Sequence, residues 1–344
     1  MEGLNEDKKI ENPVEKPKTI NKYIDLHFHL DGSIVLPIAK ELGRIQNIKL
    51  PGENDEELEK HLSVESAENL NQFLKCFELP LELLQTEIGI TESIKLVANN
   101  IKSQGVIYVE MRFAPQFHTK KGLNQEKVIQ AAIKGKNEAS IKVNLILCFI
   151  RQKNNKKENE ETLRLAKKYF KTGDIVAVDI AGDEANNPII DYKDLFDKCK
   201  EYGIPFTIHA GEADGPESVK NAINLGAKRI GHGTRAFRDN DVVELIKKND
   251  IFLEMCPTSN EKTKALDNMD DFPFMNYLNK GIKVTLNTDD MAIARTTLAN
   301  EFRYMEKKFG LNYEQEKIII SNSIDAAFAT DDVKQWLRKE FGFN

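Results

Sequence analysis

The stretch "IDLHFHLDGS" at residues 24–33 places four polar side chains in alternation with apolar ones. The polar residues are Asp25, His27, His29 and Asp31, and each is separated from the next by a single leucine or phenylalanine. Because successive side chains of a β-strand point to opposite faces, all four would share one face of a strand. Two histidines and two carboxylates on one strand face raise the question of a chemical site, for which this stretch alone is weak to moderate evidence.

The rest of the chain alternates short β-rich runs with segments of helical pattern. With residues 23–30, the predicted strands cover residues 106–113, 142–150, 175–181, 205–210, 228–233, 251–256 and 283–289. Several are near-continuous apolar runs, as is typical of parallel strands buried on both faces. Eight strand–helix units predict an α/β fold, a closed (β/α)8 TIM barrel. An open doubly wound sheet is the alternative, but neither GxGxxG nor GxxxxGK[ST] follows any predicted strand.

The first connection, residues 31–105, is longer than the others and contains extra helical material. We expect helices at residues 34–46, 65–78 and 91–103. An insertion after the first barrel strand lies at the C-terminal face, so these helices are predicted to form a lid. We interpret residues 1–20 as a flexible N-terminal arm and residues 21–344 as a single domain.

Composition narrows the class of protein. The 344 residues are 40% hydrophobic, enough for a large core, and carry a net charge of −6 with a pI near 5.7. This charge argues against a nucleic-acid partner, which usually requires a basic face. The charged N-terminus is unlike a signal peptide, and no run approaches the ~18 apolar residues of a membrane helix. We therefore expect a cytoplasmic protein with no membrane association and no evident obligate protein partner.

The four cysteines are widely spaced and form no CxxC pair. They are expected to be reduced, buried thiols rather than disulfides or metal ligands, and they are Cys76, Cys148, Cys199 and Cys256.

Histidines and carboxylates gather at the ends of different predicted strands. His27 and His29 belong to the first strand, His209 ends the fifth, and Asp289 ends the eighth. A single strand histidine is more often a hydrogen-bonded core residue than a ligand, but independent core residues would not collect at one barrel rim. Three imidazoles and one carboxylate suit Zn²⁺ or, less specifically, another divalent transition metal. A catalytic zinc makes hydroxide available at neutral pH, so the pattern predicts metal-assisted hydrolysis.

Three further residues are candidates for proton transfer or substrate binding. Glu212 follows His209 by three residues and has the position of a proton donor, although a surface carboxylate is equally consistent with the spacing. His232, flanked by glycines, is either another ligand or a base beside the metal. Asp289 and Asp290 are adjacent and cannot both face the lumen from a regular strand. We assign Asp289 to the metal and Asp290 to the substrate.

The ordered set of motifs resembles the adenosine deaminase family of metal-dependent hydrolases, over about residues 20–330. The motifs are "HFHLDG" (27–32), "DIAGDE" (179–184), "HAGE" (209–212), "GHG" (231–233), "CPTSN" (256–260) and "LNTDD" (286–290). The resemblance implies a (β/α)8 barrel that binds one Zn²⁺ per chain. It also implies deamination of adenosine and 2′-deoxyadenosine to inosine and ammonia, a reaction of purine salvage.

Roles follow from the resemblance position by position. The resemblance implies that the zinc ligands are His27, His29, His209 and Asp289. Glu212 matches the residue that protonates purine N1, and His232 matches the group that orients the attacking water and handles its proton.

The same resemblance implies the contacts of the nucleoside. Asp290 is similar to the carboxylate that pairs with purine N7, the backbone N–H of Gly182 matches the donor to N3, and Asp31 matches the carboxylate at the ribose 5′-hydroxyl. One apolar helix face matches the family helix that covers the nucleoside, although its spacing alone favours core packing; it consists of Leu70, Phe73, Leu74 and Phe77.

Other functions remain open from the sequence. An adenine deaminase, or a deaminase of another 6-aminopurine, is the nearest alternative; adenine-specific sequences tend to carry Glu where this chain has Asp31. A two-metal amidohydrolase would need a bridging lysine, and the fourth predicted strand ends in "VDIAG" without one. A non-catalytic nucleoside-binding protein is the third alternative.

Overall fold

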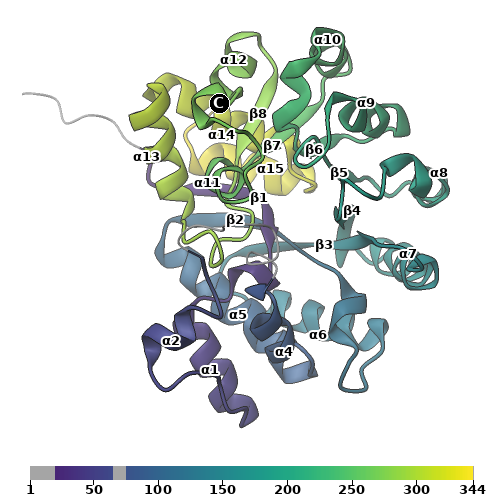
Figure 1. Ribbon diagram of the computed structural model, residues 1–344, viewed down its shortest axis with the longest axis vertical. Helices are drawn as coiled ribbons and strands as arrows, with labels where there is room; N and C mark the ends of the chain where they lie inside the picture. Colours follow the sequence, from purple (N-terminus) through teal and green to yellow (C-terminus); the bar gives the residue numbers. More distant parts are fainter. Residues whose placement is uncertain (1–19, 65–74, 344) are drawn as a thin grey trace, which may run out of the picture.

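Eight parallel strands lie at the centre of the part of the chain that the computed structural model describes, residues 20–64 and 75–343 (Figure 1). Their bounds are Tyr23–His29 (β1), Val106–Phe113 (β2), Lys142–Arg151 (β3), Ile175–Gly182 (β4), Thr207–Ala210 (β5), Arg229–His232 (β6), Phe252–Met255 (β7) and Lys283–Leu286 (β8). The eight strands lie where the β-rich runs of the sequence predicted them.

The strands close into a ring. Hydrogen-bonded ladders join them in the orders β1-β2-β3-β4 and β5-β6-β7-β8. Bridges between Val178 and Phe206, and between Phe28 and Asp289, connect these two sheets at both edges. At the second edge, the backbone N–H of Asp289 donates to the carbonyl oxygen of His27 at 2.8 Å. The predicted (β/α)8 barrel is therefore confirmed.

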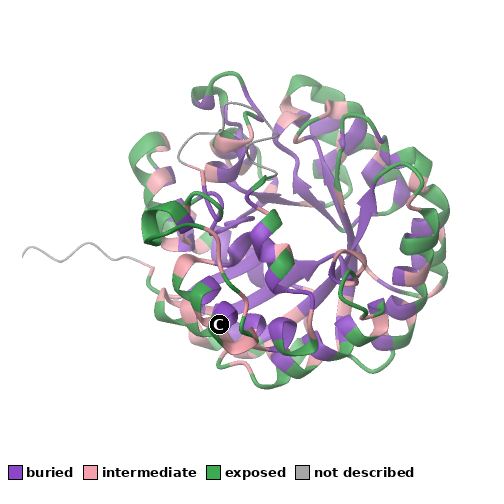
Figure 2. Cartoon of the chain, turned by 60° about the horizontal axis from the view of Figure 1, so that its bottom comes forward, coloured by how far each residue is buried: buried purple, intermediate pink, exposed green. Residues whose placement is uncertain are grey.

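Helices surround the barrel. Figure 2 shows that the strands are buried and that the outward faces of the helices are exposed. The bounds are Leu36–Gln46 (α1), Asp55–Glu59 (α2), Glu78–Leu83 (α4), Glu87–Ser103 (α5), Gln125–Asn137 (α6), Lys156–Phe170 (α7), Lys193–Glu201 (α8), Pro216–Leu225 (α9), Asn240–Lys248 (α10), Pro257–Lys262 (α11), Phe274–Asn279 (α12), Leu298–Phe309 (α13), Tyr313–Ala326 (α14) and Asp331–Glu340 (α15).

Local sequence sets where several helices begin. The side chain of Asp239 caps α10 by accepting a hydrogen bond from the N–H of Asp241, as expected for an aspartate before an apolar-periodic segment. Asn312 and Gln315 form a reciprocal capping box at the start of α14. These caps satisfy N–H groups that the first turn of a helix leaves without partners.

The long first connection contains α1, α2, α4 and α5. Two of its predicted helices are confirmed as α1 and α5, although α5 begins at Glu87, four residues earlier than expected, because Thr86 caps it. The predicted helix 65–78 lies mostly outside the described residues, as do Leu70, Phe73 and Leu74 of the predicted lid face. Phe77, just before α4, is half-buried and packs beside Cys76 and Ile293.

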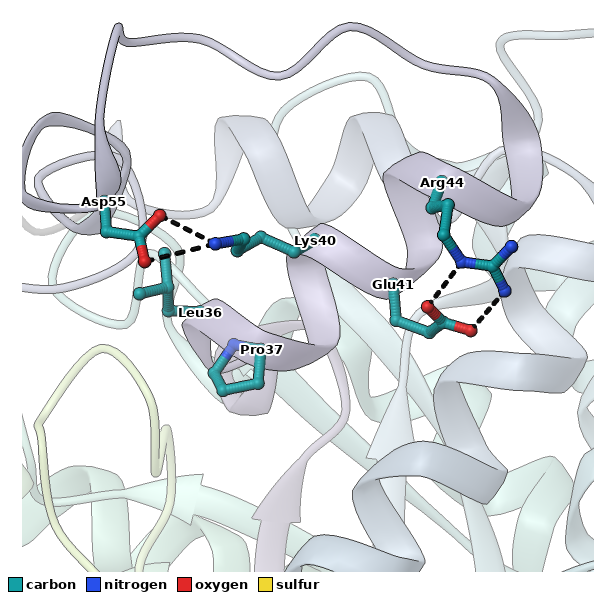
Figure 3. A pocket seen from close by; sticks show the side chains of 6 residues that line it. All are labelled: Leu36, Pro37, Lys40, Glu41, Arg44 and Asp55. Atoms are coloured by element: carbon teal, nitrogen blue, oxygen red, sulfur yellow. Dashed lines mark hydrogen bonds and ion pairs between the residues drawn. The ribbon is translucent and has the colours of Figure 1, made fainter.

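A hollow on this connection does not resemble a site for a charged ligand. Figure 3 shows its lining side chains, among them Lys40, Glu41, Arg44 and Asp55. Lys40 lies 2.8 Å from Asp55, and Arg44 lies 2.7 Å from Glu41. These four charges therefore neutralise one another in two pairs.

Among the helices of the described ranges, none is both long enough and apolar enough to cross a membrane.

Candidate metal centre and active site

The four residues predicted as metal ligands converge at the mouth of the barrel. Nε2 of His27 lies 3.1 Å, and Nε2 of His29 lies 3.3 Å, from Oδ1 of Asp289. Nε2 of His209 lies 3.2 Å from Nε2 of His29. All except His29 are buried, and His29 is only 13% exposed at its side chain. Residues from β1, β5 and the loop after β8 thus place their donor atoms around one point.

His232, at the end of β6, borders the same point. One donor atom each from His27, His209, His232 and Asp289 lie within 4.8 Å of one another. Nε2 of His232 is 3.9 Å from Oδ2 of Asp289. Distance alone therefore allows either His29 or His232 to be the third imidazole ligand.

Carboxylates on the far side of each ring assign the proton of His27 and His209. Nδ1 of His27 lies 2.7 Å from Oε2 of Glu254, and Nδ1 of His209 lies 2.9 Å from Oδ2 of Asp179. A carboxylate accepts, so in the neutral ring the proton is on Nδ1 and the lone pair of Nε2 faces the site. Both rings are therefore oriented as metal ligands.

The ring of His232 has the opposite arrangement. Its Nδ1 lies 3.0 Å from the side-chain nitrogen of Asn260, whose oxygen accepts from the hydroxyl of Thr234 at 2.6 Å. An amide nitrogen only donates, so Nδ1 of His232 accepts and its Nε2 carries the proton when the ring is neutral. A protonated Nε2 cannot bind a metal, so the hydrogen bonds favour His29 as the third imidazole ligand.

Arg112 on β2 joins the two carboxylates behind the histidines. Its guanidinium lies 2.8 Å from Asp179 and 2.9 Å from Glu254, and all three side chains are fully buried. Burial alone would raise the pKa of Glu254, but Arg112, Arg229 and His27 hold it well below its usual value. These carboxylates are therefore charged acceptors for the ring N–H groups.

Two site residues have a left-handed backbone that is uncommon outside glycine. His232 has φ 64° and Asp289 has φ 63°. This conformation costs an L-residue about 1–2 kcal/mol, and such outliers cluster at functional sites. The hydroxyl of Ser259 donates to Oδ2 of Asp289 at 2.6 Å and helps to hold that carboxylate.

The loop that carries Asp289 departs from the sequence expectation. Strand β8 ends at Leu286, three residues before the predicted end, and the loop bonds to β1 instead of extending the ladder. Asp25 accepts from the hydroxyl of Thr288 at 2.6 Å, and Oδ1 of Asn287 accepts from the N–H of Leu26 at 3.0 Å. Asp25 of β1 therefore helps to hold the loop that carries Asp289 against β1.

The candidate proton donor lies beside His232. Oε2 of Glu212, in the loop after β5, is 3.5 Å from Nε2 of His232. Oε1 of Glu212 accepts from the hydroxyl of Thr263 at 3.1 Å. The side chain of Glu212 is 22% exposed, so it contacts both the site and the open mouth.

The candidate substrate residues have unused donor or acceptor capacity. Within the described part of the chain, Oδ1 of Asp31 and Oδ1 of Asp290 are buried without a hydrogen-bond partner. Burial and the charges of Asp289 and Asp31 raise the pKa of Asp290 well above its usual value. A Cβ on Gly32 would lie 1.8 Å from Oδ1 of Asp290, so only glycine fits there. Gly182 ends β4 with φ 107°.

Sequence reasoning missed the residues that support the ligands. Asp179, Ser259 and Asn260 lie within motifs that carry the family resemblance, but their side-chain partners are distant in the sequence. Glu254 is a lone carboxylate in the apolar run "IFLEMC", and a charge in such a buried strand was a signal of a partner.

Three imidazoles and one carboxylate at the mouth of a (β/α)8 barrel define the class of metal-dependent barrel hydrolases. The adenosine deaminase family model matches residues 22–342. The chain belongs to the adenosine deaminase family.

Similar proteins cover nearly the whole chain. An adenosine deaminase of Haemophilus ducreyi is 39% identical, over 91% of this chain and 94% of its own length. An adenosine deaminase of Clostridium botulinum is 38% identical, over 92% of this chain and 97% of its own length. The crystal structure of adenine deaminase from Arthrobacter aurescens is 26% identical, with a TM-score of 0.82, and covers 94% of this chain and 98% of that one.

Proposed function

We propose that the protein catalyses zinc-dependent hydrolytic deamination of adenosine and 2′-deoxyadenosine to inosine or 2′-deoxyinosine and ammonia, a reaction of purine salvage. The observation that carries the proposal is the buried group of imidazoles and Asp289 beside Glu212 and Asp290. The names of the relatives from Haemophilus ducreyi and Clostridium botulinum support the same substrate.

The donor set fits one Zn²⁺ per chain. Nε2 of His27 is a buried nitrogen that lacks a hydrogen-bond partner in the described residues, as expected of a ligand atom. We propose His27, His29, His209 and Asp289 as the ligands, since three imidazoles and one carboxylate match the preferences of zinc. When bound, zinc acts as a Lewis acid that makes hydroxide available from water at neutral pH.

The protein side chains supply the proton transfers. The oxygen of a water adds to C6 of the purine, and the bond from C6 to the amino nitrogen then breaks. Of the two protons of that water, one replaces the proton that Glu212 gives to N1, and the other goes to the amino nitrogen, which leaves as ammonia. Glu212 delivers a proton to N1, which relieves the negative charge that addition builds on the ring. His232 orients the attacking water, because its Nε2–H is directed between Glu212 and Asp289.

The unused polar atoms at the mouth suit the nucleoside. We propose that Asp290 pairs with purine N7 and that the N–H of Gly182 donates to N3. Asp31 contacts the ribose 5′-hydroxyl, for which its buried oxygen, without a partner in the part of the chain that the structure describes, provides an acceptor. The predicted lid helix would cover the nucleoside and exclude water from the reaction.

Adenine deamination is the second candidate. The solved structure from Arthrobacter aurescens is named an adenine deaminase and shares this fold at 26% identity. The adenosine deaminase relatives have higher identity, and Asp31 provides a group for the sugar that adenine lacks. We therefore favour the nucleoside.

A substrate panel tests the proposal. Purified, zinc-loaded protein is mixed separately with adenosine, 2′-deoxyadenosine and adenine, and ammonia and the purine product are both measured. We expect release from both nucleosides and little from adenine. Release from adenine alone would overturn the substrate, and release from none of them would favour a non-catalytic nucleoside-binding protein.

The remaining sequence interpretations stay predictions. They are the single domain at residues 21–344, the cytoplasmic location, and a small-molecule purine as the binding partner without nucleic acid, membrane or obligate protein partner.

A further inference from the structure

Glu184 places its carboxylate against the loop that carries Glu212. The side chain is 3% exposed and follows β4 by two residues. Its Oε1 accepts from the N–H of Gly211 at 2.6 Å. Its Oε2 accepts from the N–H groups of Glu212, Ala213 and Asp214 at 3.1, 2.7 and 3.1 Å. One carboxylate thus binds four successive backbone N–H groups.

Such a run of N–H groups forms a concave site of the kind that usually binds an anion. Here an internal carboxylate occupies it, and the hydroxyl of Ser218 donates to Oε1 of Glu184 at 2.6 Å. Burial alone would raise the pKa of Glu184, but the bond from Ser218, the charge of Arg151 and the backbone N–H groups lower it. The charged form is therefore the one that the loop binds.

The backbone path of this loop requires glycine at position 211. Gly211 has φ 75°, and a Cβ there would lie 2.6 Å from Cγ2 of Val219. On the outer side, Arg235 donates to the carbonyl oxygen of Ala213. Glu184 is the internal anchor, and it binds the backbone of the residue that carries the candidate proton donor.

We propose that Glu184 is a positioning residue for the deamination, whose carboxylate fixes residues 211–214 and so holds the carboxyl group of Glu212 within reach of the purine ring. This inference rests on the proposed function, because it requires Glu212 to be the proton donor.

Glu184→Gln tests the anchor with the smallest change of shape. The amide nitrogen of glutamine donates and cannot accept a hydrogen bond. It would therefore face backbone N–H groups of residues 211–214 without bonding to them. We expect kcat to fall about 100-fold, as for a displacement of a reacting group by roughly 1 Å. Zinc content is expected to stay near the wild-type value, because Glu184 is not among the proposed ligands.

A double-mutant cycle separates positioning from a general structural effect. Turnover is measured for Glu212→Gln, for Glu184→Gln and for both changes together. If Glu184 acts through Glu212, the double variant is expected to be about as slow as Glu212→Gln alone. Losses that multiply in the double variant would overturn the inference.

Ser218→Ala is the matched control, because it removes one donor to the same carboxylate and leaves the four backbone bonds. We expect less than about a tenfold loss of turnover from it. Glu184→Asp, which keeps the charge, is expected to recover part of the activity lost in Glu184→Gln. If Glu184→Gln fails to fold or to bind zinc, Glu184→Asp carries the same cycle.

Two outcomes distinguish a failure of this inference from a failure of the proposed deamination mechanism. Full turnover in Glu212→Gln would reject Glu212 as proton donor, and with it the proposed mechanism. Collapse of turnover in Glu212→Gln together with wild-type turnover in Glu184→Gln would reject only the positioning role.

Discussion

Two histidines lie at the centre of the site with different hydrogen-bond environments. His29 presents Nε2 to Asp289 and His209, whereas His232 accepts from Asn260 and turns an Nε2–H toward the site. The ring nitrogen that bonds to the protein determines which nitrogen is left for the metal.

The first prediction contrasts these two residues. We expect His29→Ala to weaken zinc binding strongly, because a ligand is lost, whereas His232→Ala should retain zinc and lose turnover. Zinc content after dialysis against a graded chelator series, measured beside ammonia release from adenosine, checks both variants. Zinc loss in His232→Ala with retention in His29→Ala would reverse the ligand assignment.

A second prediction concerns the sugar. Because a buried oxygen of Asp31 lacks a partner among the described residues and is proposed to bind the 5′-hydroxyl, Asp31→Ala should lower kcat/KM for adenosine. Loss of one such hydrogen bond corresponds to roughly 10–100-fold. The slower turnover of adenine, where it is detectable, should change much less. An equal loss for both substrates would mean that Asp31 does not contact the ribose.

At the residue scale, sequence patterns located the proposed ligands better than the residues that support them. The sequence predicts these ligands because they lie at or near the ends of predicted strands, which can be recognised from the sequence alone. They are His27, His29, His209 and Asp289. Glu254 and Glu184 act through partners that lie elsewhere in the chain, such as His27 and the loop 211–214. Those pairings depend on how the barrel closes, which a single sequence does not display.

At the scale of elements, the loops after the strands have their own internal supports. Glu301 on α13 accepts from the N–H of Thr258 at the start of α11 and from the hydroxyl of Thr296. It thus joins two segments that follow β7 and β8. Strand β8 was predicted too long because Asn287 and Thr288 continue an extended pattern while bonding sideways to β1.

The third prediction follows from the burial of Glu301. Burial raises its pKa to about 7, with a smaller contribution from Asp25 and opposing hydrogen bonds from Thr258 and Thr296. The folded protein therefore keeps the proton up to about pH 7, whereas the unfolded chain releases it near 4.5. Stability from this group is complete below pH 4.5 and is lost as the pH rises through about 7.

In Glu301→Gln the side chain is neutral in both the folded and the unfolded protein at every pH of this range. Relative to the variant, the free energy of unfolding of the wild type should fall by on the order of 3 kcal/mol from pH 4.5 to above pH 7. Urea unfolding of both proteins across this range measures the difference. Parallel pH profiles for the two proteins would contradict the assigned protonation.

At the scale of the whole molecule, a buried ionic network fills the barrel beneath the metal centre. Arg229 lies 2.6 Å from Glu110 and 2.5 Å from Glu254, and Arg112 joins Glu254 to Asp179. These residues belong to β2, β4, β6 and β7. The network therefore links strands from both halves of the ring to the histidines of the site.

The fourth prediction removes one cation from this network. Arg112→Met leaves Asp179 and Glu254 with fewer partners in a buried setting, so it should destabilise the fold by about 3–5 kcal/mol. Denaturant unfolding measures this loss. Arg164→Met is the control, because Arg164 pairs with Glu161 on the exposed face of α7, where an ion pair contributes little. Similar losses in both variants would show that the network adds no special stability.

The barrel was predictable because eight apolar runs repeat in the chain with helices between them. The lid was less predictable, because the spacing of its apolar face alone favours core packing. Of that face the structure describes only Phe77, which lies beside Ile293 in the loop after β8. The covering role therefore stays a prediction.

The central claim is a single zinc ion that supports deamination of adenosine. Its most direct test is a titration in which chelator-stripped protein receives zinc stepwise while ammonia release from adenosine is measured at each step. The account predicts no turnover without metal and a linear rise to a plateau at one zinc per chain. A plateau only at two ions per chain, or full turnover by the stripped protein, would contradict it.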